Sequence, residues 1–329
     1  MSDPSDRTVI AVAVAHGRAE SLDRVFRALR DQTRPPDGIV VVDSDAQPDV
    51  KDVLARWQAE DDRMQVTVLG RNGGSAGSFA AGLEAVLAKP EATFIAAFDD
   101  DAIPAPDCLE KLLEAADELG DSDVGAIGAV SMEQSGEFAW PMFLLDRREP
   151  VRSITELEAA AGGRRAVPVA ELAWHALLIP VSTVRQVGPP RAELFMWYED
   201  VEYGLRLRRA GLTAYAVVAA HVDHPPPKRV IRANILGVPL DVPIVSPSKA
   251  YLMTRNALVV RHEYVGPKFW VVDVPLTVAR ALIAIRALPG PKLALLREAL
   301  LRPMADAARG RMGPPPPSLV ALDESTRVG

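Results

Sequence analysis

From residue 8 to residue 130 the chain alternates two hydrophobic patterns. Continuous apolar runs, which predict buried strands, lie at residues 9–15, 39–42, 66–69, 93–98 and 124–130. Between these runs apolar residues recur every three or four positions, as in the helix predicted over Leu22, Val25 and Leu29. Buried strands that alternate with amphipathic helices predict an α/β fold, in which helices flank a mostly parallel, Rossmann-like sheet.

The second half of the chain is less regular. Periodicity is lost over residues 131–170 and resumes near Glu171. Residues 269–288 are strongly apolar, but the polar and helix-breaking residues that interrupt this stretch argue against a membrane-spanning helix; they are Asp273, Pro275, Arg280 and Arg286. We predict instead an amphipathic helix on a membrane surface, with packing on the protein body or in a dimer interface as the alternative. The proline-rich residues 313–329 predict a disordered tail.

Composition and charge narrow the class of protein. The chain has 329 residues, 48% of them hydrophobic and 25% charged, which is typical of a globular protein. The single cysteine, Cys108, excludes a disulfide framework and a cysteine-built zinc site. From Pro225 onwards there are 15 Lys and Arg against 7 Asp and Glu, whereas the preceding residues have 22 against 37. The acidic body argues against nucleic acid as a partner, and the basic remainder fits an anionic membrane surface or a phosphorylated acceptor. The polar N-terminal residues do not form a signal peptide, so we expect a cytoplasmic protein.

Acidic residues follow two of the predicted strands. Asp43 ends the second strand, and Asp99, Asp100 and Asp101 directly follow the fourth. Three adjacent carboxylates repel one another unless a cation, such as a divalent metal bound to a diphosphate, neutralises them. Because ligands bind at the carboxyl ends of parallel strands, these residues predict a metal and nucleotide site at that edge. A solvated acidic turn is the alternative.

Three further stretches carry candidate chemistry. The glycine-rich residues 70–78 precede a predicted helix and would let backbone N–H groups approach a phosphate, although a flexible turn is the alternative. Residues 195–211 place aromatic residues directly before acidic ones at a helix start, a pattern that helix capping would also explain. His221 and His224 lie three residues apart, and either could bind a metal.

Six motifs in order over residues 7–264 resemble the family 2 inverting glycosyltransferases, which have a GT-A fold. They are Gln32–Asp37, Ile39–Ser44, Arg71–Gly77, Asp99–Asp101 in the place of a D-x-D motif, Glu199–Asp200 and His224–Pro225. The chain departs from the family pattern at residues 15–18, where the usual hydroxyl residue is absent. Within the family, the aspartate triplet and the Arg-Asn-Gly-Gly loop resemble bacterial galactofuranosyltransferases and rhamnosyltransferases. Those enzymes build cell-wall or surface polysaccharides on polyprenyl-diphosphate lipids.

The resemblance implies a metal-dependent transfer of a sugar from a nucleotide to a lipid-linked or cell-surface glycan. UDP-galactofuranose is the first expected donor and dTDP-rhamnose the alternative, with Mn²⁺ or Mg²⁺ as the metal. A nucleotidyltransferase also has carboxylates at a strand end, and a non-catalytic scaffold that binds nucleotide sugars is a third interpretation. A homo-oligomer is compatible with all three.

Residue roles also follow from the resemblance. Asp200 is the expected general base, and Glu199 helps to position the acceptor. The expected metal ligands are Asp99, Asp101 and His224, with His221 as the alternative to His224. The residues expected at the donor are His16, Arg18, Asp43, Arg71, Asn72, Gly73, Asp100, Trp174 and His175. Trp197 and Tyr198 are expected at the acceptor, and core packing is the alternative for Trp174.

The implied domain organisation has three parts. Residues 1–228 form the catalytic domain, in which residues 131–170 are a variable insertion on the acceptor side. Residues 229–312 form a helical accessory region on the inner face of the cell membrane, and residues 313–329 the tail. The basic residues expected at that membrane surface are Lys268, Arg280, Arg286, Lys292 and Arg297.

Overall fold

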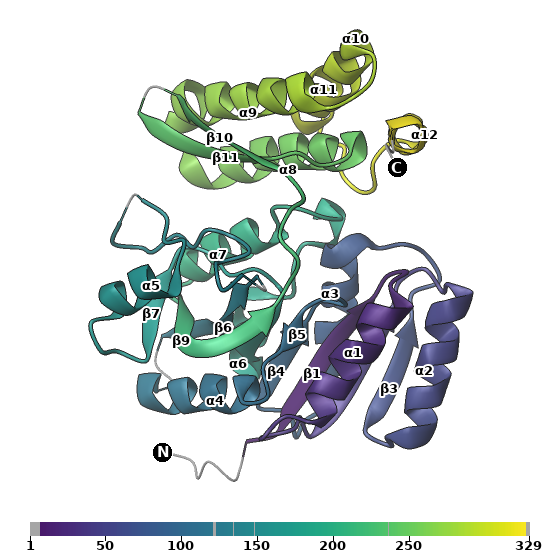
Figure 1. Ribbon diagram of the computed structural model, residues 1–329, viewed down its shortest axis with the longest axis vertical. Helices are drawn as coiled ribbons and strands as arrows, with labels where there is room; N and C mark the ends of the chain where they lie inside the picture. The colour runs from purple at the N-terminus through teal and green to yellow at the C-terminus, as the bar shows by residue number, and fades with distance from the viewer. Residues whose placement is uncertain (1–6, 121–122, 134, 148, 236, 327–329) are drawn as a thin grey trace. The chain divides into compact units, whose positions relative to one another are not determined.

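The computed structural model describes residues 7–120, 123–133, 135–147, 149–235 and 237–326. The chain divides into two compact units (Figure 1). The first unit comprises Met1–Pro190 and Tyr203–Pro226, and the second comprises Arg191–Glu202 and Pro227–Gly329. The expected catalytic domain ended at residue 228, close to Pro226. It also included residues 191–202, which the structure groups with the second unit.

The first unit is built on a nine-stranded mixed sheet, ordered β3-β2-β1-β4-β8-β6-β9-β5 with β7 paired to β9. Its strands are β1 Val9–Ala15, β2 Gly38–Asp43, β3 Met64–Val68, β4 Phe94–Phe98, β5 Ile103–Pro104, β6 Val124–Met132, β7 Ala166–Val169, β8 Ala176–Pro180 and β9 Thr213–Asp223. Strands β1 to β4 are parallel to one another, β8 runs antiparallel between β4 and β6, and β9 is parallel to β6. Six strands therefore point the same way, and the prediction of a mostly parallel sheet flanked by helices is confirmed.

Helices cover both faces of this sheet. One face packs against α1 Ala19–Arg30, α2 Pro48–Glu60 and α4 Cys108–Leu119. The other packs against α3 Gly74–Leu87, α5 Ile154–Ala161, α6 Val181–Val187 and the end of α7 Glu199–Arg209. Alternate residues of β1 divide between the two cores, as the period of a strand requires: Val9 and Ala11 face one, Ile10 and Val12 the other. The continuous apolar strands are thus explained by burial on both faces.

A glycine sets the approach of α3 to the sheet. A Cβ atom on Gly82 would lie 2.3 Å from the Cγ1 atom of Val12. No side chain fits at that separation, so the absence of one brings α3 close to β1. The start of α3 is thereby held near the ends of β1 and β2.

Residues 131–170, expected to be a variable insertion, contain α5 and β7. Isolated bridges also pair Met142 with Val151 and Leu144 with Val169. Helix α5 begins at the N-cap Ser153, whose side chain accepts from the backbone N–H of Glu156, and it ends at the left-handed Gly162. This segment therefore has local structure that its irregular hydrophobic pattern did not predict.

The second unit is mainly helical. Its elements are the 3₁₀ turn η2 Ala192–Leu194, the hairpin strands β10 Val230–Ile235 and β11 Val238–Pro243, the helix α8 Pro247–Val265, the π-helical turn η3 Phe269–Asp273, the helices α9 Val274–Ala287 and α10 Lys292–Leu296, the π-helical turn η4 Arg297–Leu301, and the helices α11 Arg302–Ala308 and α12 Pro317–Thr326. The antiparallel hairpin was not predicted. Within the described residues, none of the helices has both the length and the apolar character needed to cross a membrane.

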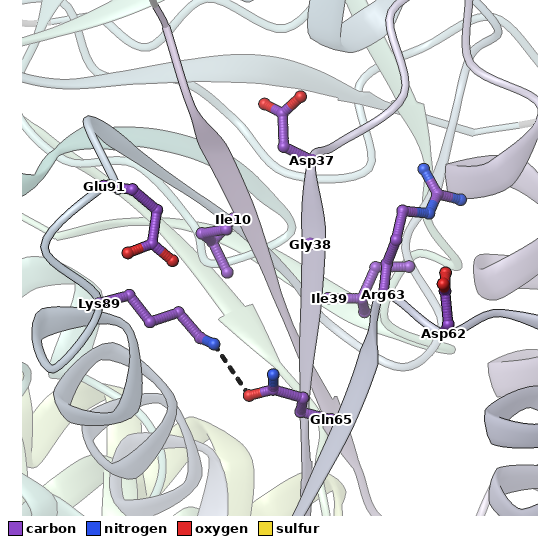
Figure 2. Close-up of a pocket in the computed structure, with 9 residues that line it drawn as sticks. All are labelled: Ile10, Asp37, Gly38, Ile39, Asp62, Arg63, Gln65, Lys89 and Glu91. Carbon is purple, nitrogen blue, oxygen red and sulfur yellow. Dashed lines mark hydrogen bonds between the residues drawn. The ribbon is translucent and has the colours of Figure 1, made fainter.

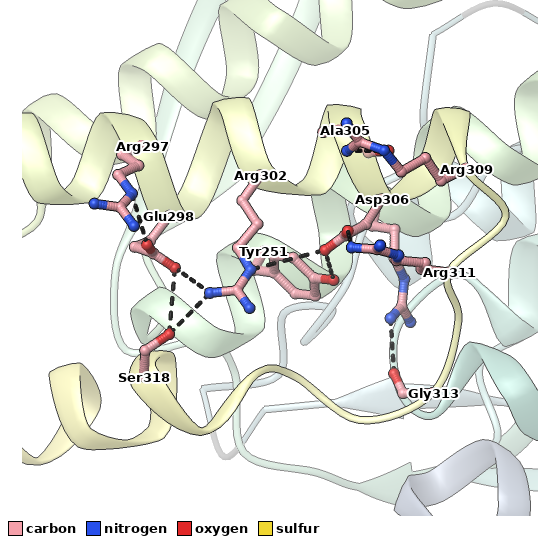
Figure 3. A network of polar contacts seen from close by, with 11 residues as sticks. Tyr251, Arg297, Glu298, Arg302, Ala305, Asp306, Arg309, Arg311, Gly313 and Ser318 are labelled. Atoms are coloured by element: carbon pink, nitrogen blue, oxygen red, sulfur yellow. Dashed lines mark hydrogen bonds and ion pairs between the residues drawn. The ribbon is translucent and has the colours of Figure 1, made fainter.

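The structure corrects the prediction of a disordered tail for residues 317–326, which form α12. Leu319 is fully buried and packs with Tyr251 and Leu252 of α8. A polar network also holds the segment (Figure 3): Arg302 bonds both Glu298 (2.8 Å) and Ser318 (2.9 Å). The proline run therefore leads into an anchored helix, because one apolar residue beyond it finds a buried site.

A second set of polar contacts in the same unit centres on Asp306. Its carboxylate accepts a hydrogen bond from the Tyr251 hydroxyl at 2.9 Å and lies 3.5 Å from the Arg311 guanidinium (Figure 3). Asp306 is 6% exposed, so its charge needs these partners. The contacts join α11 to α8, the central helix of this unit.

Candidate active site

The polar residues of the first unit gather at the edge where the parallel strands end. Asp43 is the last residue of β2, and the aspartate triplet directly follows β4. Because β8 runs antiparallel to β4, it begins at this same edge, and His175 lies one residue before it. His224 directly follows β9, which runs parallel to β6. Four separate strands thus deliver carboxylates and imidazoles to one edge.

The aspartate triplet is paired with Arg18. The Arg18 guanidinium lies 2.8 Å from the carboxylate of Asp100 and also forms an ion pair with Asp101. The backbone N–H of His16 donates to Asp100 at 3.1 Å. Burial, and secondarily the charge of Asp99, nevertheless raise the pKa of Asp100 to about 7. The three adjacent carboxylates outnumber the single charge of Arg18, and a bound cation would offset the excess negative charge.

Two histidines lie beside the triplet. The rings of His175 and His224 stack with their centroids 3.7 Å apart. One ligand atom from each, together with one carboxylate oxygen of Asp99, lie within 4.8 Å of one another. Nε2 of His224 is also 3.3 Å from Asp101. Asp99, Asp101 and His224, expected from the sequence as metal ligands, are thus brought together, and His175 joins them.

The environment keeps both imidazoles neutral. Burial lowers the pKa of His224 to about 4 and holds that of His175 well below its ordinary value. Nδ1 of His175 is 2.7 Å from the hydroxyl of Ser131, which orients the ring. A metal binds the neutral form of histidine, so the donor set of carboxylate and neutral imidazole fits a divalent cation.

His221, the alternative ligand, does not join this cluster. Its Nε2 atom lies 3.0 Å from the carbonyl oxygen of Val218. Between these residues the pairing of β9 with β6 slips, from Ala129 opposite Val217 to Val130 opposite His221. Irregularities of this kind redirect a strand near its end, and His224 then bonds through its backbone N–H to Met132 at 3.1 Å.

The residues expected at the nucleotide lie along the ends of β1, β2 and β3. Asp43 is 1% exposed, and one of its oxygens accepts from the N–H of Ala46 at 2.9 Å. His16 is 3.3 Å from Asp45. In the glycine-rich loop, Asn72 accepts from the N–H of Gly74 at 2.9 Å.

The same loop begins α3. Gly70 and Gly74 have φ of +67° and +66°, a conformation that favours glycine. The N–H of Gly73 donates to the hydroxyl of Ser44 at 3.3 Å, which ties the loop to the end of β2. Arg71 is exposed. A helix that starts in glycines beside an exposed arginine suits an anionic ligand.

Trp174 was expected at the donor, and the structure contradicts that role. Its side chain is 5% exposed and belongs to the core. The ring stacks on Phe79 (centroids 4.9 Å apart) and meets the ring of Tyr203 edge-on at 5.2 Å. Core packing, the alternative, explains this residue, because a ring so enclosed cannot stack on a sugar.

The remaining candidates belong to the second unit, in the segment Arg191–Glu202. Phe195, Trp197 and Tyr198 all have positive φ, between 67° and 71°, which costs bulky residues about 1–3 kcal/mol each. These residues lead directly into Glu199 and Asp200, the first residues of α7. Strain of this size next to two carboxylates is typical of a functional loop.

Asp200 lies at the N-terminus of α7. Its carboxylate accepts from the backbone N–H of Val201 at 2.7 Å. Burial raises its pKa above the ordinary 3.8, and the backbone hydrogen bond opposes that shift. A carboxylate with a raised pKa is a better proton acceptor than an exposed one.

A pocket at the opposite edge of the sheet is a poorer candidate. It is lined by Ile10, Asp37, Gly38, Ile39, Asp62, Arg63, Gln65, Lys89 and Glu91 (Figure 2). Gly38 begins β2, so this pocket lies at the amino end of that strand. Lys89 bonds Gln65 at 2.9 Å, and Arg63 is paired with Asp61 at 2.6 Å. Its two basic side chains therefore already have partners on the protein.

The family follows from comparison with known sequences, and the chain belongs to glycosyltransferase family 2. The sequence model described as "Glycosyl transferase family 2" matches residues 10–165, which include the aspartate triplet. The family predicted from the motifs is thus confirmed.

The chain is also similar to curated proteins that are named as galactofuranosyltransferases. The chain is 31% identical over 224 residues to the galactofuranosyltransferase GlfT1 of Mycobacterium tuberculosis strains CDC 1551 / Oshkosh and ATCC 25618 / H37Rv. It is 32% identical over 222 residues to the galactofuranosyltransferase GlfT1 of Mycolicibacterium smegmatis. Each alignment covers 66% of this chain and 70% of the relative.

Solved structures support the GT-A fold. The mannosyltransferase PcManGT from Pyrobaculum calidifontis, solved with GDP-Man and Mn²⁺, aligns with a TM-score of 0.53 at 14% identity, over 98% of this chain and 87% of that one. GalNAc-T7, solved with UDP, GalNAc and Mn²⁺, aligns with a TM-score of 0.55 at 16% identity, over 78% of this chain and 50% of that one.

Proposed function

We propose that this protein is an inverting, metal-dependent galactofuranosyltransferase that uses UDP-galactofuranose. The observation that carries the proposal is the cluster of Asp99, His175 and His224 at the carboxyl edge of the sheet. The name of the curated relatives supports the choice of sugar. The expected acceptor is a glycan linked to a polyprenyl diphosphate.

The metal would be held by Asp99, His175 and His224, with Asp101 next to His224. A mixed set of carboxylate and imidazole favours Mn²⁺ over Mg²⁺, because Mg²⁺ takes oxygen ligands almost alone. A bound divalent ion supplies Lewis-acid stabilisation of the diphosphate leaving group. The side chain of Arg18 supplies a positive charge beside the aspartate triplet. It is half-exposed and can turn from Asp100 and Asp101 to the diphosphate.

The nucleotide would lie along the ends of β1 and β2. Asp43 keeps one carboxylate oxygen beyond the one that Ala46 occupies, and this oxygen can accept the N3–H of uracil. Arg71, Asn72 and the N–H groups at the start of α3 would contact the phosphates or ribose. This arrangement favours a pyrimidine nucleotide, and hence UDP or dTDP.

Inversion requires direct attack by an acceptor hydroxyl on the anomeric carbon. A hydroxyl is a poor nucleophile at neutral pH, so a carboxylate must accept its proton as the new bond forms. We assign this role to Asp200, with Glu199 positioning the acceptor and Trp197 and Tyr198 contacting it. Partial burial of Asp200, which raises its pKa, strengthens it as a base.

We also propose that the second unit binds an anionic membrane surface. Three consecutive apolar residues of η3, Trp270, Val271 and Val272, are 67%, 75% and 43% exposed. Lys268 precedes them and is also exposed. Apolar side chains beside a basic residue can enter the headgroup region of an anionic bilayer. A lipid-linked acceptor would be found at that surface.

Calorimetric titration with UDP and with dTDP, each with and without Mn²⁺, tests the donor assignment. Binding of UDP that depends on Mn²⁺, followed by transfer from UDP-galactofuranose to a synthetic lipid-linked acceptor, is expected. A preference for dTDP would replace the donor with dTDP-rhamnose. Failure of a folded sample to bind either nucleotide would overturn the transferase assignment in favour of a scaffold.

A further inference from the structure

The loop that precedes the proposed base has a strained backbone, which needs contacts from other parts of the protein to keep its conformation. Phe195 is the centre of a γ-turn, with φ +67° and ψ −60°, closed by a hydrogen bond from the N–H of Met196 to the carbonyl oxygen of Leu194 at 2.8 Å. Trp197 and Tyr198 continue with φ of +69° and +71°. Three bulky residues in the left-handed region persist only where their surroundings determine the backbone.

Asn256 of α8 forms hydrogen bonds that stabilise this backbone conformation. Its Nδ2 atom donates to the carbonyl oxygens of Leu194 at 2.8 Å, Met196 at 3.0 Å and Trp197 at 2.8 Å. The side chain is fully buried. One amide group thus binds three carbonyls of the strained turn.

Arg255 fixes the orientation of that amide. Its Nε atom donates to Oδ1 of Asn256 at 2.9 Å, so the amide nitrogen must face the loop. The guanidinium is fully buried, donates to the carbonyl oxygens of Leu194 (3.2 Å) and Gly313 (2.7 Å), and lies over the ring of Tyr251. Because this buried arginine donates its hydrogen bonds to backbone carbonyls, we expect it to hold this segment in place.

The two ends of the segment are bound to the same helix. At its start, Arg191 forms an ion pair with Glu263 at 2.6 Å. At its end, the hydroxyl of Tyr264 donates to Glu202 at 2.7 Å. Helix α8 therefore binds the start, the middle and the end of a segment that lies about 60 residues earlier in the chain.

We propose that Asn256 and Arg255 are positioning residues, which hold residues 194–198 in the strained conformation that presents Glu199 and Asp200 to the acceptor. This inference rests on the proposed function, because it assigns no chemistry to the pair beyond the placement of the proposed base. Neither residue carries a catalytic proton.

Asn256→Asp is the sharpest test, because it keeps the shape of the side chain but replaces the donor with an acceptor that faces three carbonyls. A small displacement of a catalytic group can cost about 100-fold in rate. We expect kcat for transfer from UDP-galactofuranose to fall by about this factor, while the KM for the donor changes less than about threefold. Hydrogen exchange of the backbone amides of residues 195–202 should accelerate.

Thr254→Val is the matched control on the same helix. The buried Thr254 hydroxyl donates to the carbonyl oxygens of Ala250 (2.9 Å) and Ala299 (3.3 Å), neither of which is in the loop. This variant should lose stability without a change in kcat or in exchange at residues 195–202. Asn256→Ala, which removes the donor without adding a charge, serves if Asn256→Asp does not fold.

The outcomes separate this inference from the proposed function. A fall in kcat at constant KM, with faster exchange confined to residues 195–202, supports the positioning role. Unchanged exchange there, or a rise in exchange spread over the whole second unit, overturns it. If the wild-type protein transfers no sugar, the proposed function fails, yet faster loop exchange in Asn256→Asp but not in Thr254→Val still supports the pair as the device that holds the loop.

Discussion

The two regions that carry the candidate chemistry are built in different ways. The edge of the first unit gathers charged side chains from strands that are stable for other reasons, since each strand is buried on both faces. The segment Arg191–Glu202 of the second unit contains a strained turn, whose carbonyl groups accept hydrogen bonds from a side chain of α8. Substitutions at the sheet edge should therefore affect binding of the metal and nucleotide first, whereas substitutions at the loop or its supports should affect geometry and rate first.

The largest effect is expected from Asp200→Asn. This change keeps the shape of the side chain and removes its capacity to accept a proton, so transfer should fall by about 100- to 10,000-fold. Binding of UDP in the presence of Mn²⁺ should stay close to that of the wild type, because the metal and nucleotide candidates belong to the other unit. Initial rates and calorimetry on the same sample test both statements. Transfer that survives above a tenth of the wild-type rate would remove Asp200 as the base.

Histidine substitutions should have the opposite signature, with binding affected first. His175→Ala and His224→Ala each remove one neutral imidazole from the cluster with Asp99. The apparent affinity for Mn²⁺, measured by titration in the presence of UDP, should fall by at least the roughly 10- to 100-fold that loss of a supporting group costs. His221→Ala is the matched control, because its ring bonds the carbonyl of Val218 instead. Equal losses in all three variants would contradict the ligand assignment.

The same contrast explains what the sequence could predict. Asp43 and the aspartate triplet were expected at one edge because they follow apolar runs, and the carboxyl ends of parallel strands meet there. His175 was expected at the donor rather than near the metal candidates, because the direction of β8 could not be read from its sequence. Because β8 is antiparallel to β4, its first residues lie at the edge where β4 ends, and His175 directly precedes β8. Only the pairing of β8 with β4 reveals this direction.

The loop was beyond sequence reasoning for a different reason. Aromatic residues before Glu199 gave no sign that three of them adopt positive φ, because that conformation is unfavourable for each one alone. Its stabilising partners, Arg255 and Asn256, lie in a helix about 60 residues later. The helix α12 was missed similarly, since a single buried Leu319 is too weak a pattern to oppose a run of prolines.

A smaller effect should distinguish the exposed apolar residues of the two units. Trp270→Ala removes a largely exposed ring from η3, and full transfer of such a side chain from water is favourable by about 1.5–3 kcal/mol. Binding to vesicles that contain anionic lipid should weaken by about tenfold, as measured by co-sedimentation. Phe143→Ala, at a 39% exposed aromatic residue of the first unit, is the control and should leave binding unchanged. Equal binding by Trp270→Ala and the wild type would exclude η3 as the membrane contact.

The smallest effect concerns stability and links the loop to pH. Because burial holds the pKa of Asp200 above 3.8, the folded protein binds this proton more tightly than the unfolded chain does. The stabilisation by the neutral carboxyl is complete below pH 3.8 and is lost as the pH rises through the raised pKa. Asp200→Asn cannot ionise, so its Tm should exceed that of the wild type at pH 7 by a few degrees, and the difference should shrink as the pH falls towards 4. Thermal unfolding of both proteins across this range tests the sign. A variant that is less stable than the wild type at pH 7 would show that the ionised carboxylate stabilises the start of α7. In that case the strained turn at residues 195–198, and not the charge of Asp200, would be the feature that destabilises this part of the protein.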